Sequence, residues 1–200
     1  MKYYSKKIAY VTGAGSGIGR SICLDLAKAG AVVIAADINF DGARETAAMA
    51  PSPVLIRPVY INVADDDGVR AVFEEAVRAS GPPDFCFNCA AICITGDLLD
   101  ITAADCKRVI EVNLTGVINC SLAAYRVMAE RGRGHIVNIS SMAGFAPFSI
   151  NAPYSASKYG IVGFTESLRH EAVSRGVRVS LVCPGIVRTE FYNNAEIRKV

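Results

Sequence analysis

Tyr154 and Lys158 are the residues whose types and spacing point most directly to chemistry. Residues four apart share one face of a helix, so both side chains would project together from a helix that starts near Pro153. An unperturbed tyrosine, with a pKa of about 10, is a poor base at neutral pH, but a nearby ammonium favours the phenolate and lowers that pKa. The pair could therefore carry acid/base chemistry at a carbonyl oxygen, although the same spacing also occurs in ordinary surface pairs.

Ser140 and Ser141 bear on the role of this pair, because they end an apolar run that predicts a strand. Their hydroxyls would lie at the carboxyl edge of a sheet. Open α/β sheets bind their ligands at that edge. The serines therefore favour a reacting centre over a surface pair.

The segment 12–20, Thr-Gly-Ala-Gly-Ser-Gly-Ile-Gly-Arg, connects the first strand to a helix. Small residues let the backbone turn sharply and approach a pyrophosphate, which the free N–H groups and dipole of the helix then hold. The spacing is TGxxxGxG through Gly13, Gly17 and Gly19; GxGxxG fails at Ile18, and no Gly-Lys-Ser/Thr of a Walker loop follows. Glycine also serves plain turn geometry, but the position after the first strand favours a dinucleotide site.

Asp37 ends the second predicted strand and could accept hydrogen bonds from adenosine ribose hydroxyls. Its charge would repel a 2′-phosphate, and the neighbouring candidates Ser16 and Ile38 are neutral. We therefore expect NAD as cofactor, with NADP disfavoured. Asp37 could also act as the N-cap of a helix over 40–49.

Strands and helices alternate along the chain. Nearly continuous apolar runs predict strands at 8–12, 32–37, 54–60, 84–88, 135–140 and 177–183. Helical patterns cover about 18–29, 40–49, 65–79, 102–130 and 153–174. This alternation predicts a doubly wound, Rossmann-like α/β fold with a parallel sheet, as one domain over residues 1–200.

Composition narrows the class of protein. With 200 residues, 52% hydrophobic and 20% charged, the chain is too apolar for disorder and can bury one core. No apolar run approaches the roughly 18 residues of a membrane span, and the first residues lack the pattern of a signal peptide. The net charge of +2 is scattered, which makes a nucleic-acid partner a weak proposal. We expect a soluble cytoplasmic protein.

The seven cysteines are scattered among apolar residues. Cys86 and Cys89 have CxxC spacing, but no second ligand pair follows and His135 and His170 are isolated. We therefore expect buried thiols and no metal site.

Taken jointly, the motifs resemble the short-chain dehydrogenase/reductase family over residues 6 to about 192. The resemblance adds Asn88-Cys89-Ala90-Ala91, Asn113 and Pro184-Gly185, in the family's order. It implies four catalytic residues. Tyr154 would be the general acid/base, and Ser141, 13 residues before it, would hold the substrate oxygen. Lys158 would bind the nicotinamide ribose. Asn113 would kink the long helix and position a water in a proton relay. The cofactor-binding residues that the resemblance implies are Gly13, Ser16, Gly17, Ile18, Gly19, Asp37, Asn62, Val63, Asn88, Ala90, Tyr154, Lys158, Pro184, Gly185, Val187 and Thr189.

Three departures from the family pattern stand out. The usual Asn-Asn-Ala-Gly reads Asn-Cys-Ala-Ala at 88–91, and Asn62 replaces an Asp expected to face the adenine amino group. Relatives continue past the Pro-Gly loop through a lid and a seventh strand. The chain is therefore interpreted as truncated, with residues 191–200 supplying only the start of that lid.

The resemblance implies an NAD-dependent oxidoreductase that interconverts a secondary alcohol and a ketone. Apolar residues at 143–148 and 92–95 suggest a small hydrophobic substrate. The alternatives are an NADP-dependent carbonyl or 3-oxoacyl thioester reductase, or a nucleotide-binding protein without catalysis. The full-length protein is expected to be a homo-oligomer, a dimer or tetramer.

Overall fold

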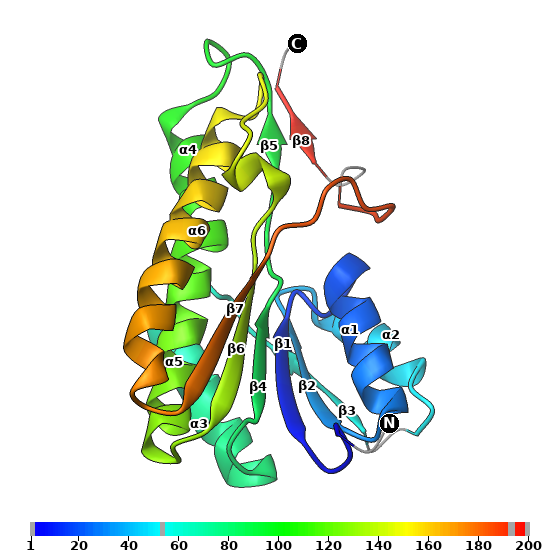
Figure 1. Cartoon of the computed structure of the whole chain (residues 1–200). Coiled ribbons are helices and arrows are strands. Elements are labelled where there is room, and N and C mark those ends of the chain that lie inside the picture. Colours follow the sequence, from blue (N-terminus) through cyan, green and yellow to red (C-terminus); the bar gives the residue numbers. More distant parts are fainter. Residues whose placement is uncertain (1–2, 53–54, 192–194, 199–200) are drawn as a thin grey trace.

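The computed structural model describes residues 3–52, 55–191 and 195–198. Its centre is a parallel sheet of six strands in the order β3-β2-β1-β4-β6-β7 (Figure 1). The strands are β1 (Ile8–Thr12), β2 (Val32–Asp37), β3 (Ile56–Tyr60), β4 (Phe85–Asn88), β6 (Gly134–Ile139) and β7 (Val177–Val182). The strand order reverses between β1 and β4, which is the switch point where open α/β sheets bind ligands.

Helices cover both faces of this sheet (Figure 1). They are α1 (Gly17–Lys28), α2 (Phe40–Ala48), α3 (Asp66–Ser80), α4 (Ala103–Ile110), α5 (Gly116–Glu130) and α6 (Ala152–Val173). Residues of α1 and α2 pack in one apolar cluster, and residues of α3, α5 and α6 pack in another on the opposite face. The predicted doubly wound α/β fold is therefore confirmed.

The helix predicted over 102–130 is interrupted. Between α4 and α5, residues Glu111–Thr115 form a single π-helical turn that contains Asn113. Such turns insert one extra residue and are frequent at functional sites. The irregularity predicted at Asn113 is thus a π-helical turn, and it divides the expected single helix in two.

The pair of short strands β5 (Ile94–Thr95) and β8 (Glu196–Ile197) was not predicted from the sequence. They pair in parallel, Ile94 opposite Glu196 and Thr95 opposite Ile197. Two-residue strands carry no periodicity that a sequence could show. Part of the expected lid, 192–194 and 199–200, and the first residue of the predicted third strand lie outside the described residues.

No helix within the described ranges combines the length and the apolarity that crossing a membrane requires.

Candidate active site

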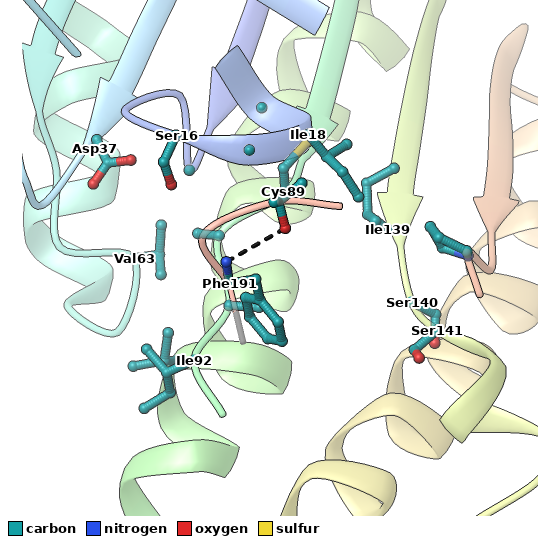
Figure 2. A pocket seen from close by; sticks show the side chains of 18 of the residues that line it. Ser16, Ile18, Asp37, Val63, Cys89, Ile92, Ile139, Ser140, Ser141 and Phe191 are labelled. Atoms are coloured by element: carbon teal, nitrogen blue, oxygen red, sulfur yellow. Dashed lines mark hydrogen bonds between the residues drawn. The ribbon is translucent and has the colours of Figure 1, made fainter. Parts of the chain in front are cut away.

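A pocket opens at the carboxyl edge of the sheet (Figure 2). Of the residues predicted for catalysis and cofactor binding, all line this pocket except Asn88 and Asn113. The pocket thus brings together the glycine loop, Asp37, the Tyr154–Lys158 pair and the Pro184–Thr189 segment.

The glycine loop has the geometry of an anion cradle. Gly13 and Gly17 have φ angles of 67° and 50°, in the left-handed region that favours glycine. A Cβ on Gly13 would lie 2.8 Å from the backbone nitrogen of Ala90, and one on Gly19 would overlap the carbonyl oxygen of Gly13. The N-cap of α1, Ser16, makes no side-chain capping bond, so the first-turn N–H groups face the pocket without an acceptor from that side chain. These residues fit a dinucleotide pyrophosphate.

Asp37 is oriented by two backbone donors. The N–H groups of Gly15 and Asn39 each donate to one of its carboxylate oxygens, at 2.8 Å. The N-cap of α2 is Asn39, whose side chain accepts from the N–H of Gly42 at 3.1 Å; the capping role considered for Asp37 was wrong. Each oxygen of Asp37 keeps a lone pair for a ribose hydroxyl.

Arg20, in the first turns of α1, is the cation to consider as a partner for a 2′-phosphate. Its guanidinium donates to the carbonyl oxygens of Gly15 and Gly42, to the Thr46 hydroxyl, and to Glu45, at 3.1 Å for the last. Because these acceptors bind the N–H groups of Arg20, its guanidinium does not neutralise the negative charge that Asp37 presents to the pocket.

Asn62 lies where it was predicted, in the pocket lining, whereas Asn88 does not line the pocket. Asn62 lines the pocket, but its side-chain oxygen accepts from the N–H of Ala64 at 3.1 Å, leaving one lone pair for adenine. Asn88 is buried beneath the pocket, where its amide donates to Ser121 at 2.9 Å and Asn138 at 2.8 Å. The side chain predicted to lie along the ribose therefore belongs to an internal polar network, because a buried amide must find partners.

Asn113 is fully buried and joins three elements. Its side-chain oxygen accepts from the N–H of Ile92 at 2.8 Å, and its amide donates to the Ile92 carbonyl at 2.9 Å and to Ser157 at 3.1 Å. The π-helical turn thus anchors the segment after β4 to α6, which carries Tyr154 and Lys158. The water relay stays a prediction.

Lys158 is a buried cation beneath Tyr154. Its Nζ donates to the Ile139 carbonyl at 3.1 Å and lies 5.4 Å from the centroid of the Tyr154 ring. Burial lowers the pKa of Lys158 to about 8, against an opposing influence of nearby thiols, first that of Cys89. The ammonium is therefore available at neutral pH but loses its proton more readily than an exposed lysine.

The two adjacent serines have different surroundings. The Ser140 hydroxyl donates to the Lys158 carbonyl at 2.9 Å and so serves the packing of α6. The Ser141 hydroxyl accepts from the N–H of Ala143 at 3.1 Å, which leaves its own proton to donate to a ligand. This difference agrees with the choice of Ser141 that the family spacing implies.

Some lining residues were missed by sequence reasoning, among them Cys89, Val112, Ile139 and Phe191. The Phe191 ring lies 5.9 Å from that of Tyr154, although 37 positions separate the two in the sequence. No local signal could have found this contact. Within the described ranges, no group of three or more His, Cys, Asp or Glu residues could hold a metal ion.

Comparisons with known proteins agree with this geometry. The sequence pattern of the family described as short chain dehydrogenase matches residues 7–199. The chain belongs to the short-chain dehydrogenase family. The relative "Probable oxidoreductase EphD" of Mycobacterium tuberculosis is 39% identical over 191 residues, covering 94% of this chain and 32% of that protein. The reductase named 3-oxoacyl-[acyl-carrier-protein] reductase FabG of Thermotoga maritima is 37% identical, covering 92% of this chain and 75% of that protein.

Among solved structures, a short-chain dehydrogenase/reductase from Burkholderia phymatum in complex with NAD superposes with a TM-score of 0.89 at 31% identity. It covers 97% of this chain, which spans 70% of that one. The chain thus spans about a third of the length of EphD and about three quarters of the shorter short-chain dehydrogenases.

Proposed function

We propose that this short-chain dehydrogenase is an NAD-dependent oxidoreductase that interconverts a secondary alcohol and a ketone. The observation that carries the proposal is that Ser141, Tyr154 and Lys158 line the same pocket as the glycine loop and Asp37. A protein that only bound nucleotide would have no need for the first three side chains beside the cofactor cradle.

The proposed chemistry divides between cofactor and protein. A bound nicotinamide supplies the hydride transfer. In the oxidation direction, the Tyr154 phenolate takes the proton of the substrate hydroxyl and returns it in reduction. Ser141 donates a hydrogen bond to the same oxygen. Protonated Lys158, 5.4 Å from the Tyr154 ring, stabilises the phenolate charge in a buried setting.

Asp37 supports NAD as the cofactor. Its carboxylate is held toward the pocket by the N–H groups of Gly15 and Asn39, and Arg20 is committed to Glu45 and backbone carbonyls. A 2′-phosphate would meet an uncompensated negative charge. The second candidate, an NADP-dependent 3-oxoacyl thioester reductase, is favoured by the 37% identity to FabG and opposed by this carboxylate.

The lining of the reacting end supports an uncharged, hydrophobic substrate. Ile92, Val112 and Phe191 line the pocket with Tyr154, and Lys158 is buried beneath it. An anionic group on the substrate would have no exposed counter-ion there among the described lining residues. Burial against apolar side chains would then supply most of the affinity.

Calorimetric titration with NADH and with NADPH tests the cofactor choice. We expect NADH to bind more tightly than NADPH, and we expect Asp37→Ala to narrow the difference between the two affinities. Tighter NADPH binding by the unaltered chain would overturn the role of Asp37. Binding of neither would contradict the cofactor cradle.

Turnover of secondary alcohols tests the reaction. Tyr154→Phe should reduce kcat by at least about 100-fold while NADH affinity stays near normal. Tyr125→Phe, a substitution of the same kind in α5, is the control. If no alcohol or ketone were turned over although NADH bound tightly, the chain would be a nucleotide-binding protein.

A further inference from the structure

A second pocket lies at the amino edge of the sheet, where the parallel strands begin, at the lower end of the sheet in Figure 1. The pocket of Tyr154 lies at the opposite, carboxyl edge. The charged residues that line the second pocket come from four chain segments. Lys7 directly precedes β1, and Asp84 directly precedes β4. Arg133 directly precedes β6, and Arg178 is the second residue of β7. The sheet therefore assembles a charged pocket from residues far apart in the sequence.

Positive charge predominates in this pocket. Among its described lining residues, the acidic side chain is Asp84, against the three cations Lys7, Arg133 and Arg178. The Asp84 carboxylate pairs with Lys7 at 3.4 Å and with Arg131 at 3.6 Å. Because two cations already share this carboxylate, none of the described lining residues supplies a further negative charge to compensate Arg133 and Arg178.

The two arginines keep N–H donors for a ligand. The guanidinium of Arg178 donates to the Tyr3 hydroxyl at 2.7 Å, which is a neutral acceptor. The Arg133 side chain has no hydrogen bond or ion pair to another residue within the described ranges. Each guanidinium carries five donors, and the Tyr3 oxygen, in accepting from Arg178, keeps its own proton to donate. The pocket thus offers several donors to an acceptor-rich ligand.

Backbone packing brings the segments of the two arginines together. Gly132 and Gly176 have φ angles of 63° and 68°, in the left-handed region that favours glycine. A Cβ on Gly176 would overlap the Gly132 carbonyl oxygen, so the two turns are in direct contact. Strands β6 and β7 then begin side by side, with His135 opposite Arg178. Since Arg133 follows the first glycine and Arg178 lies two residues after the second, this contact places both cations at one pocket.

The surroundings of Arg178 are fixed as well. The Tyr3 ring packs edge to face on Tyr4 and Phe85, with centroids 5.0 and 6.1 Å apart, and this packing holds its hydroxyl beside Arg178. Burial lowers the pKa of His135, and the charge of Arg178 lowers it further. The positive charge of Arg178 therefore acts on its neighbours, as that of an uncompensated cation does.

We propose that this pocket binds a phosphate group, which belongs either to a free phosphate compound or to a lipid headgroup. A phosphate dianion matches the excess of positive charge. Its oxygens would accept hydrogen bonds from the guanidinium groups of Arg133 and Arg178 and from the Tyr3 hydroxyl. The site lies at the edge of the sheet away from Tyr154, so this inference does not rest on the proposed oxidoreductase function.

The test is a ¹H–¹⁵N NMR titration of the chain with inorganic phosphate at pH 7.5, with chloride at matched ionic strength as the reference. We expect the backbone signals of Gly134 and Gly176, which line the pocket, to shift with a Kd of about 1 mM. Arg133→Gln should weaken binding by at least about tenfold, because hydrogen bonds to a charged group are lost. Tyr3→Phe, which keeps the ring, should weaken it by about threefold. Arg44→Gln removes the same charge from an exposed position of α2 and, as the matched control, should leave the Kd unchanged.

Signals that respond no more to phosphate than to chloride would overturn the inference. Phosphate binding by Arg133→Gln as tight as that of the unaltered chain would also overturn it. So would shifts confined to the glycine loop at 12–19, because phosphate would then occupy only the cofactor cradle.

Sedimentation with vesicles of phosphatidic acid and phosphatidylcholine separates the two sources of the phosphate group. Sedimentation that Arg133→Gln abolishes and Arg44→Gln does not would support a lipid headgroup as the ligand. Binding of inorganic phosphate at Gly134 and Gly176 without sedimentation would support a free phosphate compound.

Discussion

The glycine loop at 12–19 and the strap at 184–191 line one pocket but are held in different ways. The loop is fixed by the left-handed φ angles of Gly13 and Gly17 and by the close approach of Gly19 to the Gly13 carbonyl. The strap is mostly exposed and without regular secondary structure, and strand β8 beyond it is locked to α4 through Arg198.

This difference suggests that the loop and the strap have different roles, the loop in binding the cofactor and the strap in binding the substrate. A cradle made of backbone admits one ligand shape, which suits a cofactor common to a whole family. A strap fixed mainly at its ends can carry different side chains without disturbing the sheet. The pocket would therefore be preorganised for the cofactor and adaptable for the substrate.

The largest expected effect comes from breaking the loop. Gly19→Ala places a Cβ on the Gly13 carbonyl oxygen, and the loop must shift to accept it. We expect a loss of about 3 kcal/mol in the free energy of unfolding and at least about a 100-fold loss of NADH affinity, measured by urea unfolding and calorimetry. Gly163→Ala, at an exposed position of α6 with open space around it, should instead stabilise by up to about 1 kcal/mol. Equal effects of the two substitutions would contradict a loop fixed by backbone geometry.

An intermediate effect is expected at Lys158, which lines the same pocket. Because burial lowers its pKa to about 8 in the folded state, the unfolded chain binds the extra proton between about pH 8 and 10.5. The free energy of unfolding should therefore rise with pH in that window. Lys158→Met removes this contribution.

Urea unfolding at pH 7.5 and pH 10, without cofactor, measures it. From pH 7.5 to pH 10 the free energy of unfolding of the unaltered chain should rise by on the order of 2–3 kcal/mol more than that of the Met variant. Parallel pH profiles would show that Lys158 is protonated throughout and that its burial costs little.

The smallest effect is expected from releasing the strap. Arg198→Gln removes the bidentate pair with Asp105, so the melting temperature should fall by about 2 °C, and a protease should cut residues 185–191 faster. Arg44→Gln, which breaks an exposed pair with Asp41, should change neither. Unchanged proteolysis in Arg198→Gln would mean that the strap is held by its own contacts.

Much of the fold could be read from the sequence because its signals are local. Continuous apolar runs marked all six strands of the main sheet, and the glycine spacing marked the turn into α1. The break at Asn113 followed from the family pattern. The outer ends of the helices agree with the predictions to within one residue. The capping side chain of α2 was not predicted, since capping depends on which side chain reaches a free N–H, and Asn39 does so in place of Asp37.

The sequence by itself determined the sheet, the cradle and the Tyr154–Lys158 pair, because strand periodicity, glycine geometry and helical spacing act within a few residues. Only the tertiary structure decided that Asn88 turns inward to Asn138, that Ser140 bonds α6 while Ser141 keeps a proton to donate, and that Phe191 lies against Tyr154. Each of these depends on partners far apart in the chain, which must meet before a buried polar group or an apolar ring finds its place.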